Sequence, residues 1–364
     1  MTHPMQFFSG SRAGSRQPSP GVRPRAWLGL AAWLVAVAPA IAATPPAVLA
    51  QPAPDLSAPA LPAPALPAAE LPAAELPTGP ALPPIVAGDS GEHHPGKMVF
   101  AELVTPDLAG AARFYGTLFG WRIEPLADAR ARHAPSNYAQ AMLGGHPVAG
   151  MVERPIPPGE HRQPSWISFF AVTDMRAARQ LAEEHGARPL LGPHRIPGRG
   201  AQAVLADPQG AVFAIIASQH GDPPDLPADP GEWIWSALIT TDPDAAAGFY
   251  QTLFDYEVFE LPPSPGAQHL ILADAAYARA SVNTLPSGQP GQHSHWISFI
   301  RVADAAATAA RVTALGGRVL EPPRMDRHGA RVALVADPQG AAFGVMEWRD
   351  EDTPGPGDGE AGAK

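Results

Sequence analysis

The sequence predicts an α+β protein in which a unit of one strand, one helix and about three further strands occurs four times. Long stretches of the chain recur in the same order, which indicates two copies of one domain. Within each copy, two strand-like runs lead through an aspartate into a segment of helical period. A turn tetrapeptide then joins the last two strands of each copy. We therefore expect tandem βαβββ modules that follow a disordered N-terminal region.

The repeat consists of three pairs of matching blocks. TPDLAGAARFYGTLFGW from Thr105 matches TDPDAAAGFYQTLFDY from Thr241, SWISFFAVTDMRAARQLAEEHGA from Ser165 matches HWISFIRVADAAATAARVTALGG from His295, and VLADPQGAVFAII from Val204 matches LVADPQGAAFGVM from Leu334. The order and the gaps are similar, so chance is a poor explanation. The matches place the first copy at residues 93–220 and the second at residues 232–350, joined by a Pro-rich loop at residues 221–231.

Each copy contains a fainter internal repeat that predicts its helices. Four segments, AELVTPDLAGAARFY, SFFAVTDMRAARQLA, ALITTDPDAAAGFY and SFIRVADAAATAARV, pass from an apolar run through Asp to a helical pattern. The aspartates Asp107, Asp174, Asp242 and Asp304 are expected to cap these helices rather than to catalyse a reaction. Glycines end the second helix of each copy, and the two DPQG tetrapeptides, Asp207–Gly210 and Asp337–Gly340, are typical of hairpin turns.

The N-terminal part of the chain is typical of a targeting signal and a tether. Four arginines precede the apolar run WLGLAAWLVAVAPAIA, and Ala40-Ile41-Ala42 has the small-residue pattern of a cleavage site. Residues 1–43 are therefore expected to be a signal peptide, or a membrane anchor if they are not cleaved, and the protein to be exported, periplasmic or secreted. Residues 44–92 are expected to be a Pro/Ala-rich disordered linker, and residues 351–364 a disordered tail.

The composition excludes several functional classes. The chain of 364 residues has no cysteine, which removes disulfides, thiolate metal sites and cysteine nucleophiles. The net charge is −10 and Lys97 and Lys364 are the two lysines, which argues against a nucleic-acid or anionic-membrane surface. The expected partner is therefore a small-molecule ligand. The sequence does not predict the oligomeric state.

The sequence resembles the vicinal oxygen chelate superfamily, which includes glyoxalase, bleomycin-resistance and extradiol dioxygenase domains. Three blocks carry this resemblance when they are taken together: strand-TPD-helix-FYGTLFGW, WISF-strand-Asp-helix and DPQGA-strand. The resemblance covers nearly all of residues 98–348. It implies that paired βαβββ modules form two incomplete-barrel domains, each around a concave pocket. Side chains alternate across a strand, so the residues that face each pocket can be named.

The resemblance also implies where a divalent metal would be bound, namely by the first and last strands of the modules. The matching first-strand positions are Phe100, Ile167, Trp235 and Ile297, and the matching last-strand positions are Ala214 and Gly344. None of these side chains donates a lone pair to a cation. Glu153 and Asn283 offer one oxygen ligand each, which is too few for a site. We therefore predict no metal site and no cofactor, with a divalent metal retained as the alternative.

The remaining site candidates follow from strand parity. Glu102 shares a strand face with Phe100 and is therefore expected to point toward the apolar pocket. Burial there would raise the pKa of Glu102 and suit it to act as a general base. The alternative is that Glu102 pairs with a nearby arginine. The predicted ligand-binding residues are Phe100, Glu102, Ile167, Phe169, Trp235, His295, Ile297 and Phe299. Such aromatic and aliphatic walls suit a flat or aliphatic ligand, unless the side chains pack the barrel shut. His293 and His295 are expected to be solvated loop residues at the entrance of a strand.

These observations favour an exported, metal-free protein that binds a small apolar or aromatic molecule. A metal-dependent lyase or dioxygenase of the glyoxalase type, and a non-catalytic scaffold with filled pockets, are the alternatives. The resemblance leaves enzymatic activity uncertain, because the family's ligands are absent at the matching positions.

Overall fold

The computed structural model describes residues 76–126, 137–155, 163–262, 267–274, 277–285, 293–325 and 331–348. The predicted signal peptide at residues 1–43, most of the predicted linker and the predicted tail at residues 351–364 lie outside the described residues. No helix among the described residues has the length and apolarity needed to cross a membrane.

The first copy folds into one eight-stranded sheet with two helices. Its elements are β1 (Met98–Thr105), α1 (Leu108–Phe119), β2 (Arg122–Pro125), β3 (Tyr138–Leu143), β4 (His146–Glu153), β5 (Ser165–Ala171), α2 (Met175–Glu184), β6 (Arg188–Ile196), β7 (Gly200–Ala206) and β8 (Val212–Ser218). The strand order is β2-β3-β4-β1-β5-β8-β7-β6. The two modules meet where β1 pairs antiparallel with β5, and each first strand pairs in parallel with the last strand of its own module.

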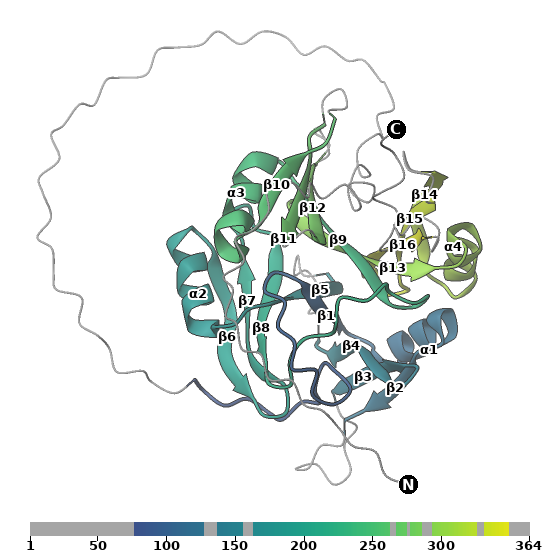
Figure 1. Ribbon diagram of the computed structural model, residues 1–364. Helices are drawn as coiled ribbons and strands as arrows, with labels where there is room; N and C mark the ends of the chain where they lie inside the picture. The colour runs from purple at the N-terminus through teal and green to yellow at the C-terminus, as the bar shows by residue number, and fades with distance from the viewer. Residues whose placement is uncertain are drawn as a thin grey trace, which may run out of the picture.

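The second copy repeats this topology in a second eight-stranded sheet. Its elements are β9 (Trp233–Thr240), α3 (Pro243–Phe254), β10 (Glu257–Glu260), β11 (His269–Asp274), β12 (Tyr277–Thr284), β13 (His295–Val302), α4 (Ala305–Ala314), β14 (Arg318–Met325), β15 (Arg331–Ala336) and β16 (Ala342–Glu347). The order is β10-β11-β12-β9-β13-β16-β15-β14, as Figure 1 shows for the green and yellow part of the chain. The predicted α+β class and the four βαβββ modules are confirmed.

The predicted helix caps are confirmed. Asp107 accepts a hydrogen bond from the amide of Gly110, and Asp242 accepts one from the amide of Ala245. Asp174 and Asp304 cap α2 and α4 in the same way. In both DPQG turns the first carboxylate accepts hydrogen bonds from the amides that follow it, which ends one strand and starts the next.

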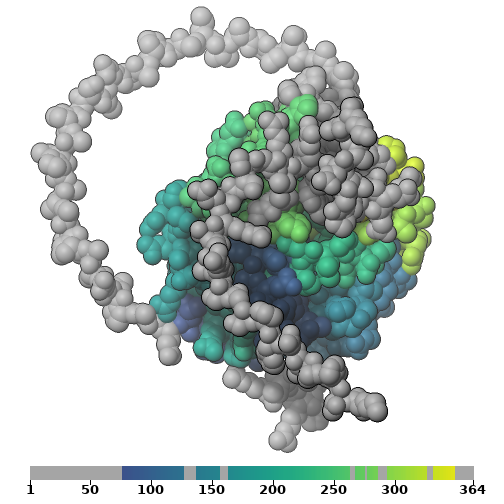
Figure 2. All heavy atoms as spheres, in the orientation of Figure 1, coloured from purple at the N-terminus to yellow at the C-terminus, as the bar shows by residue number. Residues whose placement is uncertain are grey.

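The two copies pack against each other through their helical faces. One apolar core joins α1 and the inner strands of the first module to α4, β15 and β16 of the second copy. A second core joins α2, β7 and β8 to α3, β11 and β12. Each helix therefore contributes to a core shared by both copies, and Figure 2 shows the purple-to-teal and green-to-yellow parts as one continuous body. We call the face of each sheet opposite the helices its concave face.

The structure differs from the sequence prediction at the start of the first domain. Residues 76–92 belong to the predicted disordered linker, yet they are placed against the first sheet, and Ile85 and Val86 are buried in it. In Figure 1 this purple segment runs beside β6, β7 and β8 before it enters β1. The composition of the segment predicts disorder and carries no signal for its burial. The burial depends on contacts that Ile85 and Val86 make with residues much later in the sequence.

Candidate functional site

The face of each sheet that points away from the helices carries the residues predicted from strand parity. Phe100, Phe169 and the partly buried Ile167 belong to an apolar cluster on this face of the first sheet. Trp235, Ile297 and Phe299 belong to the corresponding cluster of the second sheet. Whether any of the six contacts a ligand stays a prediction.

The first concave face has a buried polar centre around Arg199. The guanidinium places Nη1 at 3.1 Å from Glu102 Oε2 and donates from Nη2 to the Tyr138 hydroxyl at 2.6 Å. It also lies over the rings of Phe100 and Tyr138, at 5.0 and 5.3 Å from their centroids. A desolvated cation held by a carboxylate and two aromatic rings is a strong, directional arrangement.

Glu102 is thus paired with an arginine, which was the alternative to its role as a base. Burial raises the pKa of Glu102, although the charge and hydrogen bond of Arg199 act in the opposite direction. Burial likewise raises the pKa of Tyr138. Gly150 on β4 makes room for the pair, because a Cβ there would lie 2.3 Å from the Tyr138 hydroxyl and 3.0 Å from Glu102 Oε2. The catalytic role of Glu102 stays a prediction.

Arg199 was missed by the sequence analysis. It lies between two glycines in the turn from β6 to β7, and its side chain is fully buried. An arginine in a glycine-rich turn ordinarily points to solvent, so the sequence carries no signal for its inward direction. The structure assigns it the central position of the first concave face.

The second concave face has a different polar group. His269 on β11 places Nδ1 at 3.0 Å from Asn283 Oδ1, and Asn283 donates to the Ser281 hydroxyl at 3.1 Å. The Trp235 indole N–H also donates to Ser281, at 3.1 Å. His269 Nε2 is buried and has no hydrogen-bond partner among the described residues. No sequence spacing connects His269 to Asn283, so the sequence carries no signal for this pair.

His295 is the first residue of β13 and pairs with Ile239 of β9, which pairs in turn with Asn283 of β12. His295 Nδ1 is 2.8 Å from the carbonyl oxygen of His293, and burial lowers the pKa of His295. The ring centroids of the two histidines are 6.2 Å apart. His293 precedes the strand and is exposed, as expected, whereas His295 belongs to the strand and is partly buried, so it is not the solvated loop residue that the sequence predicts. A ligand contact from His295 stays a prediction.

The donor set does not fit a divalent metal among the described residues. No group of three or more His, Cys, Asp or Glu side chains gathers there. In the first copy, Glu102 is already neutralised by Arg199, whose charge repels a cation. In the second copy, Gly344 is covered by Phe299, since a Cβ at position 344 would lie 2.1 Å from that ring. A ligating side chain at position 344 would therefore displace the aromatic wall.

The second copy also has an open pocket at the start of β9 and β12, with a volume of about 160 Å³. Four aromatic residues line it, Trp233, Trp235, Tyr277 and Trp348, together with Met98 of the first copy and residues 225–228 of the loop between the copies. Lys97 and Arg279 lie at one side, next to Asp225 of the loop between the copies. The pocket thus combines ring faces with a charged border.

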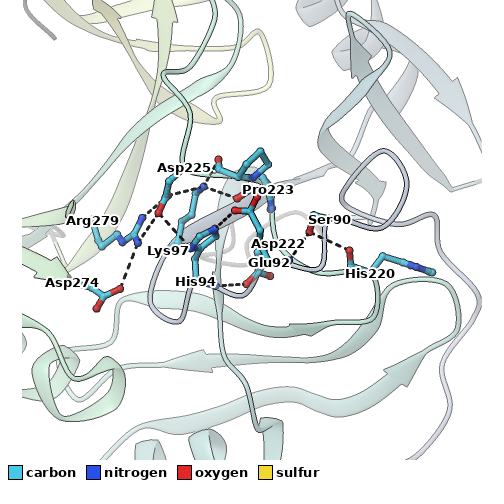
Figure 3. A network of polar contacts seen from close by, with 11 residues as sticks. Ser90, Glu92, His94, Lys97, His220, Asp222, Pro223, Asp225, Asp274 and Arg279 are labelled. Carbon is cyan, nitrogen blue, oxygen red and sulfur yellow. Dashed lines mark hydrogen bonds and ion pairs between the residues drawn. The ribbon is translucent and has the colours of Figure 1, made fainter. Parts of the chain in front are cut away.

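The charged border is a partly buried ion cluster centred on Asp225 (Figure 3). Arg279 donates to both carboxylate oxygens, at 2.7 and 3.0 Å, and Lys97 Nζ lies at 2.9 Å. Burial would raise the pKa of Asp225, but the hydrogen bonds from Arg279 and Lys97 outweigh it and lower the pKa to about 2. Burial lowers the pKa of Lys97. The cluster holds the loop between the copies beside the pocket.

Comparison with known proteins agrees with this architecture. Residues 98–216 and 235–346 match the family described as a glyoxalase-like domain. The putative glyoxylase CFP32 of Mycobacterium tuberculosis is 30% identical over 258 residues, which is 70% of this chain and 96% of that protein. The anthracycline biosynthesis protein DauV of Streptomyces sp. is 30% identical over 266 residues, covering 70% of this chain and 94% of its own length.

Solved structures show the same fold. An extradiol ring-cleaving dioxygenase from B. fuscum superposes with a TM-score of 0.50 at 13% identity, over 74% of this chain and 77% of that one. The homoprotocatechuate 2,3-dioxygenase of Arthrobacter globiformis has a TM-score of 0.50 at 14% identity, over 71% of this chain and 84% of its own. At these identities the likeness concerns the fold.

Proposed function

Because this chain belongs to the glyoxalase-like family of the vicinal oxygen chelate superfamily, we propose that it binds a small apolar or aromatic molecule in the second copy without a metal. The observation that carries the proposal is the open pocket lined by Trp233, Trp235, Tyr277 and Trp348. Aromatic walls of this kind retain flat ligands by burial and ring contact.

The hydrogen bonds around the pocket favour apolar recognition. The indole N–H of Trp235 is used by Ser281, and the indole N–H of Trp233 donates to the carbonyl of Val148 at 2.9 Å. Both rings are therefore fixed, and their polar atoms are engaged within the protein. Arg279 at the border of the pocket keeps a buried Nε that has no hydrogen-bond partner among the described residues. A ligand therefore meets ring faces and edges together with this one donor, which suits an aromatic system with few polar groups.

Two further considerations support this ligand class. DauV is described as an anthracycline biosynthesis protein, and anthracyclines are flat polycyclic aromatic molecules. Of the positions that the resemblance assigns to metal ligands, Trp235 lines this pocket and adds apolar surface to it instead of a ligand. Both considerations point to binding by shape.

Titration of the EDTA-treated protein with an anthraquinone, followed by quenching of tryptophan fluorescence, tests the proposal. We expect saturable quenching and a raised melting temperature, because the ligand binds the folded state. Ala278 lines the pocket, so Ala278→Phe should fill it and weaken binding at least about tenfold. Val319→Phe, on the exposed face of β14, is the matched control and should bind normally.

The alternatives have their own outcomes. Binding or turnover that requires added Fe²⁺, Mn²⁺, Ni²⁺ or Zn²⁺ would favour a metal-dependent lyase or dioxygenase. Absence of binding across a broad aromatic panel would favour a scaffold. Quenching that Ala278→Phe leaves unchanged would place the ligand elsewhere and contradict the proposed pocket.

Export is a separate part of the proposal and rests on residues 1–43 alone. The arginines, the apolar run and the Ala-Ile-Ala pattern support a cleaved signal. N-terminal sequencing of the protein recovered outside the cytoplasm should begin near Ala43. Recovery of the intact N-terminus in the cytoplasm would contradict export.

A further inference from the structure

The concave face of the first copy is occupied by residues 77–86 of the same chain. Ile85 is 1% exposed and Val86 is 7% exposed, and both belong to the apolar cluster of Phe100 and Phe169. The neighbouring Ala87 is exposed. Two consecutive aliphatic side chains therefore pack against the concave face of the first sheet.

The backbone of this segment is attached to β6 and its turn. Gly79 donates to the carbonyl of Arg195 at 2.8 Å, and Arg195 donates to the carbonyl of Pro77 at 2.8 Å. Leu82 donates to the carbonyl of Pro197 at 3.1 Å. These bonds are of the kind that an added edge strand makes, and they fix the direction of the segment.

Two side chains of the concave face bind successive carbonyl groups of the segment. Arg199 Nε donates to the carbonyl of Pro83 at 3.0 Å, and Gln140 Nε2 donates to the carbonyl of Pro84 at 2.8 Å. A proline has no N–H, so a Pro-Pro pair presents acceptors without leaving buried donors unsatisfied. Extended proline segments also lose little conformational entropy on binding.

A glycine at the turn admits the segment. Gly198 has a φ of +84°, and a Cβ there would lie 2.6 Å from the carbonyl oxygen of Leu82. The turn therefore lets the segment approach the sheet closely. Gly198, Arg199 and Gln140 together form a surface that is complementary to the backbone of the segment.

The equivalent positions of the second copy lack these groups. The topological repeat aligns Tyr138 and Gln140 of β3 with His269 and Ile271 of β11, and Glu102 of β1 with Ala237 of β9. Ile271 cannot donate to a carbonyl, and Ala237 cannot hold an arginine. The carbonyl-binding pattern is specific to the first copy.

We propose that the first concave face is a binding site for an extended, proline-containing peptide segment with an aliphatic anchor, and that residues 77–86 are its resident occupant. While bound, the occupant closes this site to other ligands. Because the segment is tethered to β1, its effective concentration is high, and an outside ligand competes poorly with it. The proposal concerns the first copy and does not depend on the pocket of the second.

A labelled peptide spanning residues 76–88, added to the full chain, tests the proposal by fluorescence anisotropy. The wild type should bind it weakly, since the site is occupied. Ile85→Asp should release the resident segment and raise the affinity for the peptide at least about tenfold. Ala87→Asp adds the same charge at an exposed neighbour and should behave as the wild type.

Adding Gln140→Leu to Ile85→Asp should reduce the gain several-fold, because one carbonyl loses its donor. Folded Ile85→Asp protein that binds the peptide no better than the wild type, as measured alongside circular dichroism, would overturn the proposal. Anthraquinone binding in the second copy should be the same in all variants, which separates this test from that of the proposed function.

Cleavage of the folded protein provides a second test that needs no core substitution. A protease site inserted between Gly88 and Asp89 allows the segment to be cut after folding. We expect the cut fragment to leave on gel filtration and the labelled peptide to take its place. A fragment that stays bound on dilution and does not exchange would show that the segment is a permanent part of the core, contrary to the proposal.

Discussion

The hydroxyl of Tyr115 donates a hydrogen bond to Oδ2 of Asp337 at 3.1 Å, across a sequence separation of 222 residues. It joins α1 of the first copy to the turn between β15 and β16 of the second. Tyr250 makes the corresponding bond to Asp207 at 3.0 Å. Burial and the nearby aspartate raise the pKa of Tyr115 well above its usual range, so the hydroxyl remains a donor. The repeat thus produces a reciprocal pair of bonds that joins the copies.

Tyr115→Phe should lower the free energy of unfolding by about 1–3 kcal/mol, because the buried Asp337 carboxylate loses a donor. Urea unfolding measures the change. Tyr250→Phe should cost a similar amount, and the double variant should show the sum, since the two bonds lie in separate cores. Leu226→Ala, at a side chain 74% exposed, is the control and should have no effect. A wild-type stability in Tyr115→Phe would show that the bond contributes nothing to holding the copies together.

Glu102→Leu should be strongly destabilising. It leaves the fully buried guanidinium of Arg199 without its counter-ion, a change that typically costs about 3–5 kcal/mol. The double variant Glu102→Leu with Arg199→Met should recover much of this loss, since an apolar pair replaces the ion pair. The melting temperatures of the wild type, Glu102→Leu and the double variant measure the loss and its recovery. A single variant as stable as the wild type would mean that Glu102 does not stabilise Arg199.

Local sequence patterns predicted the parts of the fold that depend on local chemistry. Asp107 and Asp242 precede helical segments, and such aspartates cap helices wherever the backbone turns in this way. Strand parity placed Phe100 and Phe299 on the face opposite the helices, because alternation is a property of the backbone. The repeat carried these assignments from one copy to the other.

The parts that were missed depend on contacts between distant segments. Ile85 lies in a Pro/Ala-rich stretch that predicts disorder, and its burial follows from an apolar cluster formed with residues from position 99 onward. Arg199 turns inward because Glu102 and Tyr138 neutralise and solvate it, and neither is near it in sequence. The joining of the copies through their helices likewise depends on shape complementarity that no single segment encodes.

Acid should weaken the cluster around Asp225. Its pKa in the folded protein is about 2, below the ordinary value of 3.8, so its contribution is present above about pH 4 and is lost as the pH falls toward 2. The shift corresponds to about 2 kcal/mol. Lys97, Arg279, His94 and Asp274 surround it in this cluster, and Asp222 lies nearby (Figure 3).

Urea unfolding between pH 2 and 7 measures this contribution. The wild type should lose stability between about pH 4 and 2 more steeply than Asp225→Asn, which lacks the titrating carboxylate. At pH 7 the variant should be less stable, because Lys97 and Arg279 then lack their shared partner. Asp89→Asn, at an exposed aspartate, is the control and should follow the wild-type profile. Parallel profiles for wild type and Asp225→Asn would assign the acid sensitivity to other groups.

Gly344→Ala should destabilise the second copy, because its Cβ would overlap the ring of Phe299 at 2.1 Å. Overpacking of this kind typically costs about 1–3 kcal/mol. Phe299→Leu made together with Gly344→Ala should relieve the overlap, so the double variant should be more stable than the sum of the two single changes predicts. Gly248→Ala, where a Cβ meets open space on α3, is the matched control and should be neutral or stabilising. Calorimetric unfolding of the wild type, the two single variants and the double variant gives the coupling free energy between positions 299 and 344. Additive effects would show that Phe299 does not fill the position where the resemblance places a metal ligand.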